Sequence, residues 1–103
     1  VTCYPRFDFL LCEMNQLVNH TDKINHITRR QFSPRMIIRV LVGAKKSLDG
    51  DEQHTQNYIR EFKNIFEFIK VYDLFDEKKI FSSYKEAFNN KKINLIVEYS
   101  EKY

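Results

Sequence analysis

The chain has 103 residues, a formal net charge of +3 and a 15% share of aromatic residues. A chain of this length forms at most one small domain. This small positive charge argues against a nucleic-acid binder, because such proteins usually have a larger and clustered excess of basic residues. Glycine and proline occur only twice each, which argues against a disordered or fibrous chain. We therefore expect one folded domain over residues 1–103.

The first part of the chain has the pattern of a long helix followed by a buried strand. Apolar residues recur every three or four positions over about residues 8–28, which predicts a helix, and Asp8 suits its N-cap. Pro34 breaks any continuing helix. The β-branched run over residues 36–42 then predicts a buried strand. Arg39 interrupts this strand and requires a partner if the strand is central.

The second part of the chain alternates between helices and strands. After a polar loop at residues 43–52, the pattern predicts a helix at 55–64, a strand at 68–72, a helix at 76–90 and a strand at 93–99. The expected buried stripe of the last helix comprises Ile80, Phe81, Tyr84, Ala87 and Phe88. The alternation predicts a three-layer α/β fold, with a small parallel sheet of three strands and crossover helices. The open edges of so small a sheet need a partner, so we expect it to be part of a larger sheet.

The two cysteines, Cys3 and Cys12, do not indicate a metal site, since no histidine accompanies them at zinc spacing. Cys12 falls on the apolar side of the first helix, which predicts a free thiol in the core. Free thiols suit a reducing compartment. The chain also has no apolar run long enough for a membrane span and no visible signal peptide, so we expect a cytoplasmic protein.

A polar loop after the strand at 36–42 holds the candidate chemistry. Gln53, His54 and Thr55 follow each other there, and side chains that follow a buried strand lie at the carboxyl end of the sheet in α/β enzymes. Neutral histidine can accept or donate a proton near physiological pH, and glutamine and threonine can orient it or a ligand. The alternative is an exposed loop that happens to contain a histidine. His20 and His26 lie on different faces of the first helix, so we expect both at the surface and not in a shared metal site.

Several blocks occur in an order that resembles a known family. Phe7-Asp8-Phe9 opens the first helix, Asn15-Gln16 follows within it, Ile38-Arg39 lies in the strand, Gln53-His54-Thr55-Gln56 follows, and a last apolar strand ends near Glu98. This set resembles the pyrimidine-binding domain of thiamine-diphosphate-dependent enzymes. The chain is most similar to the β subunit of the 2-oxoacid dehydrogenase decarboxylase component and to transketolase-like relatives. The resemblance covers nearly the whole chain and matches the later portion of that domain.

The resemblance implies roles for particular residues. Phe9 would stack on the aminopyrimidine ring of thiamine diphosphate, although a phenylalanine at a helix start can equally be a core residue. His54 would lie in the substrate channel and assist proton movement, with Gln53 and Thr55 shaping that channel. A companion domain or subunit would hold the diphosphate and its Mg²⁺. The protein would therefore work as a homo- or hetero-oligomer on a small 2-oxo acid or keto sugar.

Some positions depart from the family pattern. The glutamate that activates the aminopyrimidine in the family lies upstream of the matched region, and no residue here is assigned to it. Arg29 and Arg30 stand where relatives often carry a glycine pair, and Asp51-Glu52 replaces the usual pair of a glycine and a small residue. These departures support an alternative, a non-catalytic interaction module that keeps the fold without the chemistry. A nucleic-acid binder that uses the basic stretch from Arg29 to Lys46 is a weaker third hypothesis.

Overall fold

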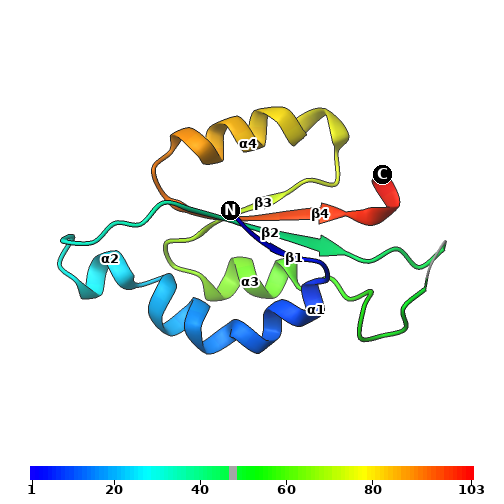
Figure 1. The fold of residues 1–103 in the computed structure, drawn as a ribbon, viewed down its shortest axis with the longest axis horizontal. Helices are drawn as coiled ribbons and strands as arrows, with labels where there is room; N and C mark the ends of the chain where they lie inside the picture. The colour runs from blue at the N-terminus through cyan, green and yellow to red at the C-terminus, as the bar shows by residue number, and fades with distance from the viewer. Residues whose placement is uncertain (47–48) are drawn as a thin grey trace.

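The computed structural model describes residues 1–46 and 49–103 and has a four-stranded, all-parallel sheet between two layers of helix (Figure 1). The strands lie in the order β1-β2-β4-β3, with bounds of Thr2–Tyr4 (β1), Met36–Val42 (β2), Lys70–Asp73 (β3) and Ile93–Tyr99 (β4). Strands β2 and β4 form the centre and pair in register from Met36 opposite Ile93 to Val42 opposite Tyr99. The predicted α/β fold and both central strands are confirmed, and β1 is a fourth strand that the sequence pattern did not reveal.

The helices divide between the two faces of the sheet as the strand order requires. The connections from β1 to β2 and from β2 to β3 run in one direction across the sheet, whereas the connection from β3 to β4 runs back. Right-handed crossovers therefore place the last connection on the opposite face, and Figure 1 shows its helix alone above the sheet. The helical segments are α1 (Phe7–Leu10), η1 (Leu11–Glu13), η2 (Gln16–Thr21), α2 (Ile24–Ile27), α3 (Ile59–Ile65), η3 (Glu77–Lys79), α4 (Ile80–Asn89) and η4 (Ser100–Lys102). No helix within the described residues is long and apolar enough to cross a membrane.

The first helical stretch is less regular than the apolar spacing predicts. Instead of one helix it comprises α1, the 3₁₀ turn η1, the π-helical segment η2 and α2. The N-cap is Arg6, and Asp8 lies in the first turn without capping it, so the predicted cap was wrong. Cys12 lies in the 3₁₀ turn and is exposed, so the predicted core thiol was also wrong. The cap differs because the helix begins at Phe7, which places Asp8 inside the first turn. Cys12 differs because the 3₁₀ turn rotates its side chain away from the position that a uniform 3.6-residue period assigns to it.

The main core fills the space between the sheet and the layer that contains α1 and α3. Its largest side chains include Phe7 and Phe62, whose ring centroids lie 5.1 Å apart, and they pack on Val40, Leu95 and Val97 of the central strands. A smaller core on the other face joins α4 to the sheet through Ile37, Tyr72, Leu74, Ala87 and Ile96. All seven residues of β4 are buried, because this strand has a neighbour on each side and side chains on both faces.

Helix α4 packs on the sheet through fewer residues than predicted. Ala87 is buried, but Phe81 and Phe88 are 79% and 76% exposed, so the prediction that these two phenylalanines are buried was wrong. Glu86 pairs with Lys70 of the edge strand β3. Phe81 and Phe88 lie on the opposite flank of the helix, which faces the β2 and β1 side. In the part of the chain that the structure describes, no second helix covers β1 and β2 on this face (Figure 1). Both rings therefore stay in solvent.

Candidate functional site

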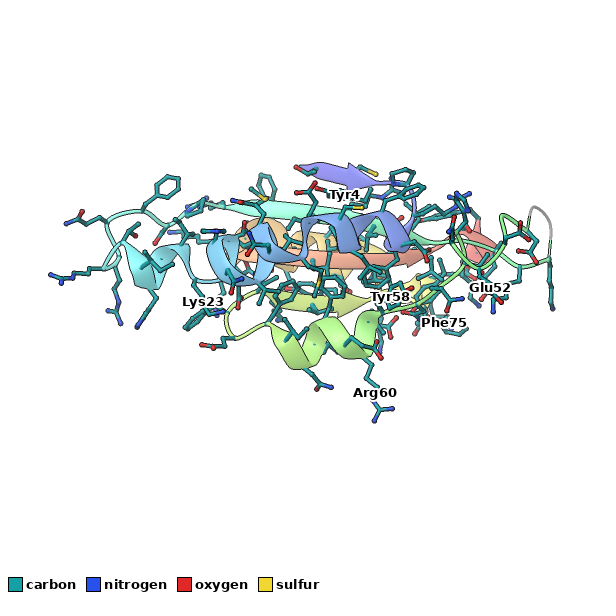
Figure 2. The ribbon with its side chains drawn as sticks, turned by 90° about the horizontal axis from the view of Figure 1, so that it is seen from below. Tyr4, Lys23, Glu52, Tyr58, Arg60 and Phe75 are labelled. Carbon is teal, nitrogen blue, oxygen red and sulfur yellow. The ribbon has the colours of Figure 1, made fainter. Side chains whose placement is uncertain are left out.

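The candidate residues lie at the carboxyl end of the parallel sheet. Strand β1 leads through Pro5 and Arg6 into α1, which carries Phe9, and the neighbouring strand β2 leads into the loop that carries His54. In open α/β sheets, ligands bind outside the carboxyl ends of the strands. In Figure 2, Glu52 and Tyr58 lie toward this end of the molecule.

Phe9 and His54 meet at this edge although they are far apart in the sequence. Their ring centroids lie 5.4 Å apart at an interplanar angle of 89°, which is an edge-to-face contact. Phe9 is 44% exposed and is therefore not a core aromatic residue. The structure thus brings together the two residues to which the resemblance assigns roles, and it leaves part of the phenylalanine ring open to a ligand.

His54 is positioned by the only two glycines of the chain. A Cβ atom on Gly43 would lie 2.1 Å from the carbonyl oxygen of His54, and one on Gly50 would lie 2.8 Å from the Cβ atom of His54. Real Cβ atoms do not approach other atoms so closely, so each position needs glycine for close approach. The imidazole Nδ1 lies 2.5 Å from the carbonyl oxygen of Gly50, which fixes the orientation of the ring.

Replacing Gly43 with alanine should displace the backbone of His54. The new methyl group would overlap the His54 carbonyl oxygen, so we expect the free energy of unfolding to fall by about 2 kcal/mol. Nuclear Overhauser contacts between the Phe9 and His54 rings should also weaken. Urea unfolding measures the first effect and NMR the second. Lys45→Ala, an exposed change nearby in the same loop, is the control and should change neither. Unchanged ring contacts in Gly43→Ala would show that the close backbone approach is not required.

Gln53 and Thr55, the predicted substrate-channel residues, differ in their surroundings. Gln53 is exposed and lines the hollows beside Phe9 and His54. Thr55 is buried, and its hydroxyl donates to the carbonyl oxygen of Asp51 at 3.1 Å. Thr55 therefore holds the loop in shape, whereas Gln53 is placed where it can touch a ligand.

An open hollow of about 460 Å³ lies beside Phe9. It is lined by Asp8, Phe9, Leu11, Glu52, Gln53, Gln56 and Tyr58. The Tyr58 hydroxyl donates to Oδ1 of Asp8 at 3.5 Å, and burial together with the charge of Asp8 raises the pKa of Tyr58. Oδ2 of Asp8 is buried and has no hydrogen-bond partner among the described residues. Sequence reasoning assigned neither residue to the site, because their contact joins segments that are distant in the chain.

The hollow has features that fit the aminopyrimidine half of thiamine diphosphate. A partly exposed aromatic ring can stack on a flat heterocycle. The Asp8 carboxylate is an acceptor that an amino group could satisfy after a small rotation of the side chain. For the metal-bound half there is no such fit within residues 1–46 and 49–103, where no three His, Cys, Asp or Glu side chains are grouped to hold a metal ion.

Tyr99 joins the carboxyl ends of β3 and β4 to the segment before α3. Tyr99 donates to Oδ1 of Asp73 at 2.8 Å and accepts from Nδ2 of Asn57 at 3.1 Å. Burial, reinforced by the hydrogen bond to Asp73, raises the pKa of Tyr99 to about 12. This contact anchors the segment before α3, and with it Tyr58, against the sheet.

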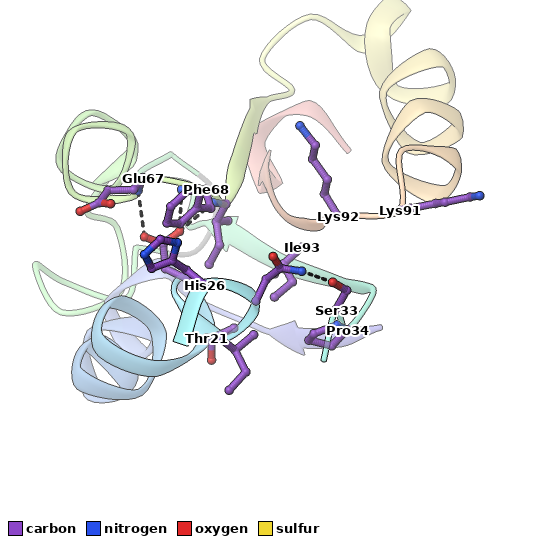
Figure 3. Close-up of a pocket in the computed structure, with 13 residues that line it drawn as sticks. Thr21, His26, Ser33, Pro34, Glu67, Phe68, Lys91, Lys92 and Ile93 are labelled. Carbon is purple, nitrogen blue, oxygen red and sulfur yellow. Dashed lines mark hydrogen bonds between the residues drawn. The ribbon is translucent and has the colours of Figure 1, made fainter. Parts of the chain in front are cut away.

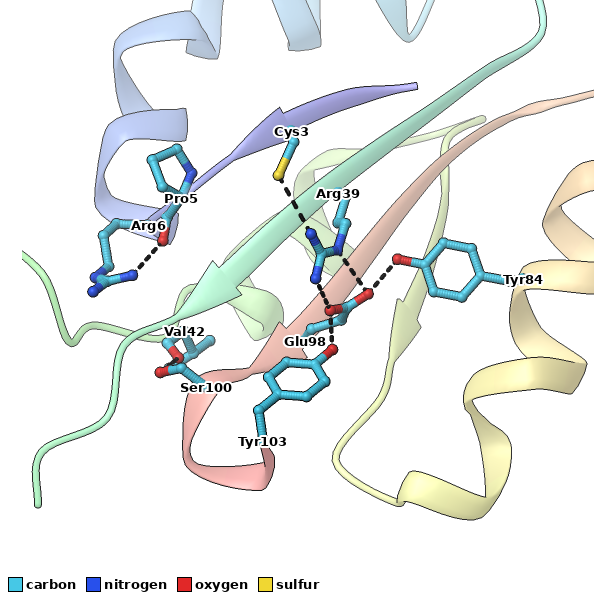
Figure 4. A network of polar contacts seen from close by, with 9 residues as sticks. All are labelled: Cys3, Pro5, Arg6, Arg39, Val42, Tyr84, Glu98, Ser100 and Tyr103. Carbon is cyan, nitrogen blue, oxygen red and sulfur yellow. Dashed lines mark hydrogen bonds and ion pairs between the residues drawn. The ribbon is translucent and has the colours of Figure 1, made fainter. Parts of the chain in front are cut away.

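A second polar cluster lies on the α4 face of the sheet (Figure 4). Arg39 donates from Nε to Oε1 of Glu98 at 2.9 Å and from Nη2 to Oε2 at 2.6 Å, so the partner expected for Arg39 is present. The hydroxyls of Tyr84 and Tyr103 also donate to Glu98. Burial alone would raise the pKa of Glu98, but these hydrogen bonds outweigh it and hold the pKa below its ordinary value. Because every contact is internal, this cluster supports the fold.

A separate cleft of about 340 Å³ (Figure 3) lies at the amino end of the sheet, and its lining includes neither Phe9 nor His54. The rings of His26 and Phe68 stack at its wall with centroids 6.1 Å apart. The carboxylate of Asp22 also lies there and accepts hydrogen bonds from the backbone N–H groups of Glu67, Phe68 and Ile69. His20 and His26 are both exposed, as predicted.

Comparison of the chain with protein-family models, with curated proteins and with solved structures finds no match.

Proposed function

We propose that this chain supplies the pyrimidine-side and substrate-channel surface of a thiamine-diphosphate-dependent enzyme, of the 2-oxoacid decarboxylase or dehydrogenase type or transketolase-like. The observation that carries the proposal is the contact between Phe9 and His54 at the carboxyl end of a parallel sheet, beside an open hollow. Both residues come from the blocks on which the family resemblance depends. Their meeting in space is an observation that is independent of their order in the sequence.

The backbone gives a second line of support. Arg29, Arg30 and Asp51 have φ angles of 51°, 66° and 65°, in the left-handed region that favours glycine. These are positions at which the resemblance places glycines in the relatives. The substitutions therefore change the side chains while the backbone keeps the conformation that a glycine would favour.

In the proposed enzyme each residue has a limited task. Thiamine diphosphate, when bound, supplies the electron sink for cleaving a bond next to a carbonyl. Phe9 stacks on the aminopyrimidine and fixes its plane, and His54 holds or moves a proton at the substrate. A companion domain or subunit holds the diphosphate and Mg²⁺, so the complete site forms in a homo- or hetero-oligomer. We place this assembly in the cytoplasm, and the free thiols of Cys3 and Cys12 are in keeping with that location.

The proposal predicts that the chain binds the pyrimidine half of the cofactor. The probe is 4-amino-5-hydroxymethyl-2-methylpyrimidine, titrated into the ¹⁵N-labelled chain. We expect saturable amide shifts at Phe9, Gln53 and His54. Phe9→Ala should weaken the binding roughly tenfold, because stacking of a base on an aromatic ring contributes about 1–3 kcal/mol.

Phe88→Ala is the matched control, since it removes an exposed phenylalanine from the other face of the sheet. It should leave the titration unchanged. Shifts that do not saturate, or that survive Phe9→Ala intact, would overturn the proposal.

The second candidate function is a non-catalytic interaction module, and the exposed flank of α4 favours it. Phe81 and Phe88 form an apolar stripe beside the uncovered face of β1 and β2, and exposed apolar patches commonly mark protein interfaces. Among the described residues no strand pairs with the outer edge of β1, so this edge is also open to pairing. The pyrimidine titration separates the two functions, because a module that has lost the chemistry has no reason to retain a site that depends on Phe9.

A further inference from the structure

The two hollows at the candidate site carry acidic groups and no basic ones. Asp8 and Glu52 line the hollow beside Phe9, and Asp51 and Glu52 line the neighbouring hollow, which His54 also lines. Neither lining includes a lysine or an arginine from the described part of the chain. Arg6 lies against Gly43 but lines neither hollow, and its guanidinium donates to the carbonyl oxygen of Pro5 at 2.7 Å.

This charge pattern disfavours an anionic substrate. A unit charge about 8 Å away in water contributes roughly 0.5 kcal/mol. Two or three carboxylates therefore oppose a bound carboxylate by about 1 kcal/mol, which corresponds to about a fivefold loss of affinity at low salt. A neutral ligand avoids this penalty.

The hydrogen bonding of His54 also favours a neutral ligand over a carboxylate. The carbonyl oxygen of Gly50 can only accept, so Nδ1 of the imidazole must carry the hydrogen in their 2.5 Å contact. In the neutral ring Nε2 then has the free lone pair and acts as an acceptor. An acceptor pairs with a hydroxyl group of a ligand, whereas a carboxylate offers it no hydrogen.

We propose that this site takes a neutral hydroxy-ketone, the chemistry of a keto sugar, in preference to a 2-oxo acid. The inference rests on the proposed function and narrows its substrate class. A ligand hydroxyl donates to Nε2 of His54, and the exposed amide of Gln53 is placed to bind a further oxygen. Asp51 and Glu52, which stand where relatives carry smaller uncharged residues, supply the discrimination.

The direct test compares two small ligands of similar size. 1,3-Dihydroxyacetone and pyruvate are titrated separately into the ¹⁵N-labelled chain at low salt, and the amide shifts of residues 50–56 are followed. We expect dihydroxyacetone to bind about fivefold more tightly, with the difference shrinking as salt is added. Equal binding, or tighter binding of pyruvate, would overturn the inference.

Charge variants test the cause of the preference. Asp51→Asn with Glu52→Gln removes two charges from the site, and asparagine tolerates the positive φ at position 51. This double variant should lose most of the salt-dependent part of the preference and keep the part that the Nε2 acceptor of His54 supplies. Glu13→Gln with Glu67→Gln removes the same charge from exposed positions that line neither hollow and should keep the preference. An unchanged preference in the site variant would overturn the electrostatic explanation.

The protonation pattern of the ring gives a readout that does not depend on ligand binding. Long-range ¹H–¹⁵N correlation spectra should show His54 protonated at Nδ1 and free at Nε2, with the exposed His20 and His26 as internal references. Gly50→Ala, whose Cβ would crowd the ring, should abolish this pattern. A ring protonated at Nε2 in the unaltered chain would overturn the inference.

These results separate the inference from the function on which it rests. Saturable binding of the pyrimidine that depends on Phe9, combined with equal binding of both small ligands, overturns the substrate class alone. Binding of neither the pyrimidine nor the hydroxy-ketone overturns both.

Discussion

Replacing Asp22 with alanine should lower the free energy of unfolding by about 4 kcal/mol, because three charge-assisted hydrogen bonds are lost at once. The buried carboxylate accepts from the N–H groups of Glu67 at 2.8 Å, Phe68 at 2.9 Å and Ile69 at 2.7 Å. These bonds join the end of η2 to the turn that leads into β3. Alanine would leave the donors of this turn without an acceptor, and the one at Ile69 is buried. Urea unfolding followed by far-ultraviolet circular dichroism measures the loss.

Asp76→Ala is the matched control for Asp22→Ala. Asp76 also accepts a backbone hydrogen bond, from Lys78 at 3.1 Å, but it is an exposed cap of a helical turn. Loss of such a cap costs about 1 kcal/mol. The loss of unfolding free energy in Asp22→Asn should lie between those of Asp22→Ala and Asp76→Ala. The asparagine amide keeps one acceptor oxygen, but its NH₂ group then faces a backbone N–H, which is also a donor. Equal losses for Asp22→Ala and Asp76→Ala would contradict a special role for the buried carboxylate.

The central strands could be predicted because their sequence signal is local. The apolar run of β4 is buried on both faces, as in other parallel sheets, whereas the β-branched run of β2 is buried mainly on the face of the main core, through Ile38, Val40 and Val42. Strand β1 has only three residues, two of them exposed, and its place in the sheet is set by pairing with β2. Three residues are too few to show either the alternation of a strand or the 3.6-residue period of a helix, so the sequence alone does not identify β1.

The errors in the helices have a tertiary origin. The spacing of Phe81 and Phe88 places them on one side of α4, but it cannot say how much of the sheet this helix covers. The π-helical turn, in which the N–H of Asp22 donates to the carbonyl oxygen of Leu17 at 2.8 Å, likewise has no simple periodic signature. This π-helical turn ends immediately before Asp22, whose side chain accepts the hydrogen bonds from the backbone of residues 67–69.

The candidate site was predictable only in part. The block around His54 stands out because polar residues follow a strand and a glycine, and Phe9 was assigned through the family resemblance. Asp8 and Tyr58, in contrast, become site residues only when the chain folds and brings them together. The positions of both glycines against His54 are also invisible in the sequence, where each looks like an ordinary loop residue.

Breaking the ion pair between Arg39 and Glu98 should have an asymmetric effect on stability. Glu98 is 3% exposed, whereas the side chain of Arg39 is 35% exposed and can turn toward water. Arg39→Met leaves a buried carboxylate without its cation and should cost about 3 kcal/mol. Glu98→Met leaves an arginine that water can reach, so we expect the free energy of unfolding to fall by only about 1 kcal/mol. Urea unfolding of both variants at neutral pH measures the two losses.

The double variant Arg39→Met with Glu98→Met supplies the control, because it removes both charges and fills the space with apolar side chains. It should recover most of the stability that Arg39→Met loses, since buried ion pairs and apolar replacements often contribute similarly.

The pH dependence of stability follows from the lowered pKa of Glu98 in the folded protein. Its contribution is complete above the unfolded pKa of about 4.3 and is lost as the pH falls through the lower, folded pKa. The unaltered protein should therefore lose its advantage over Arg39→Met in acid, where protonation removes the charge that the arginine compensates. A deficit of Arg39→Met that stays constant from neutral to acid pH would show that the arginine acts through packing and not through its charge.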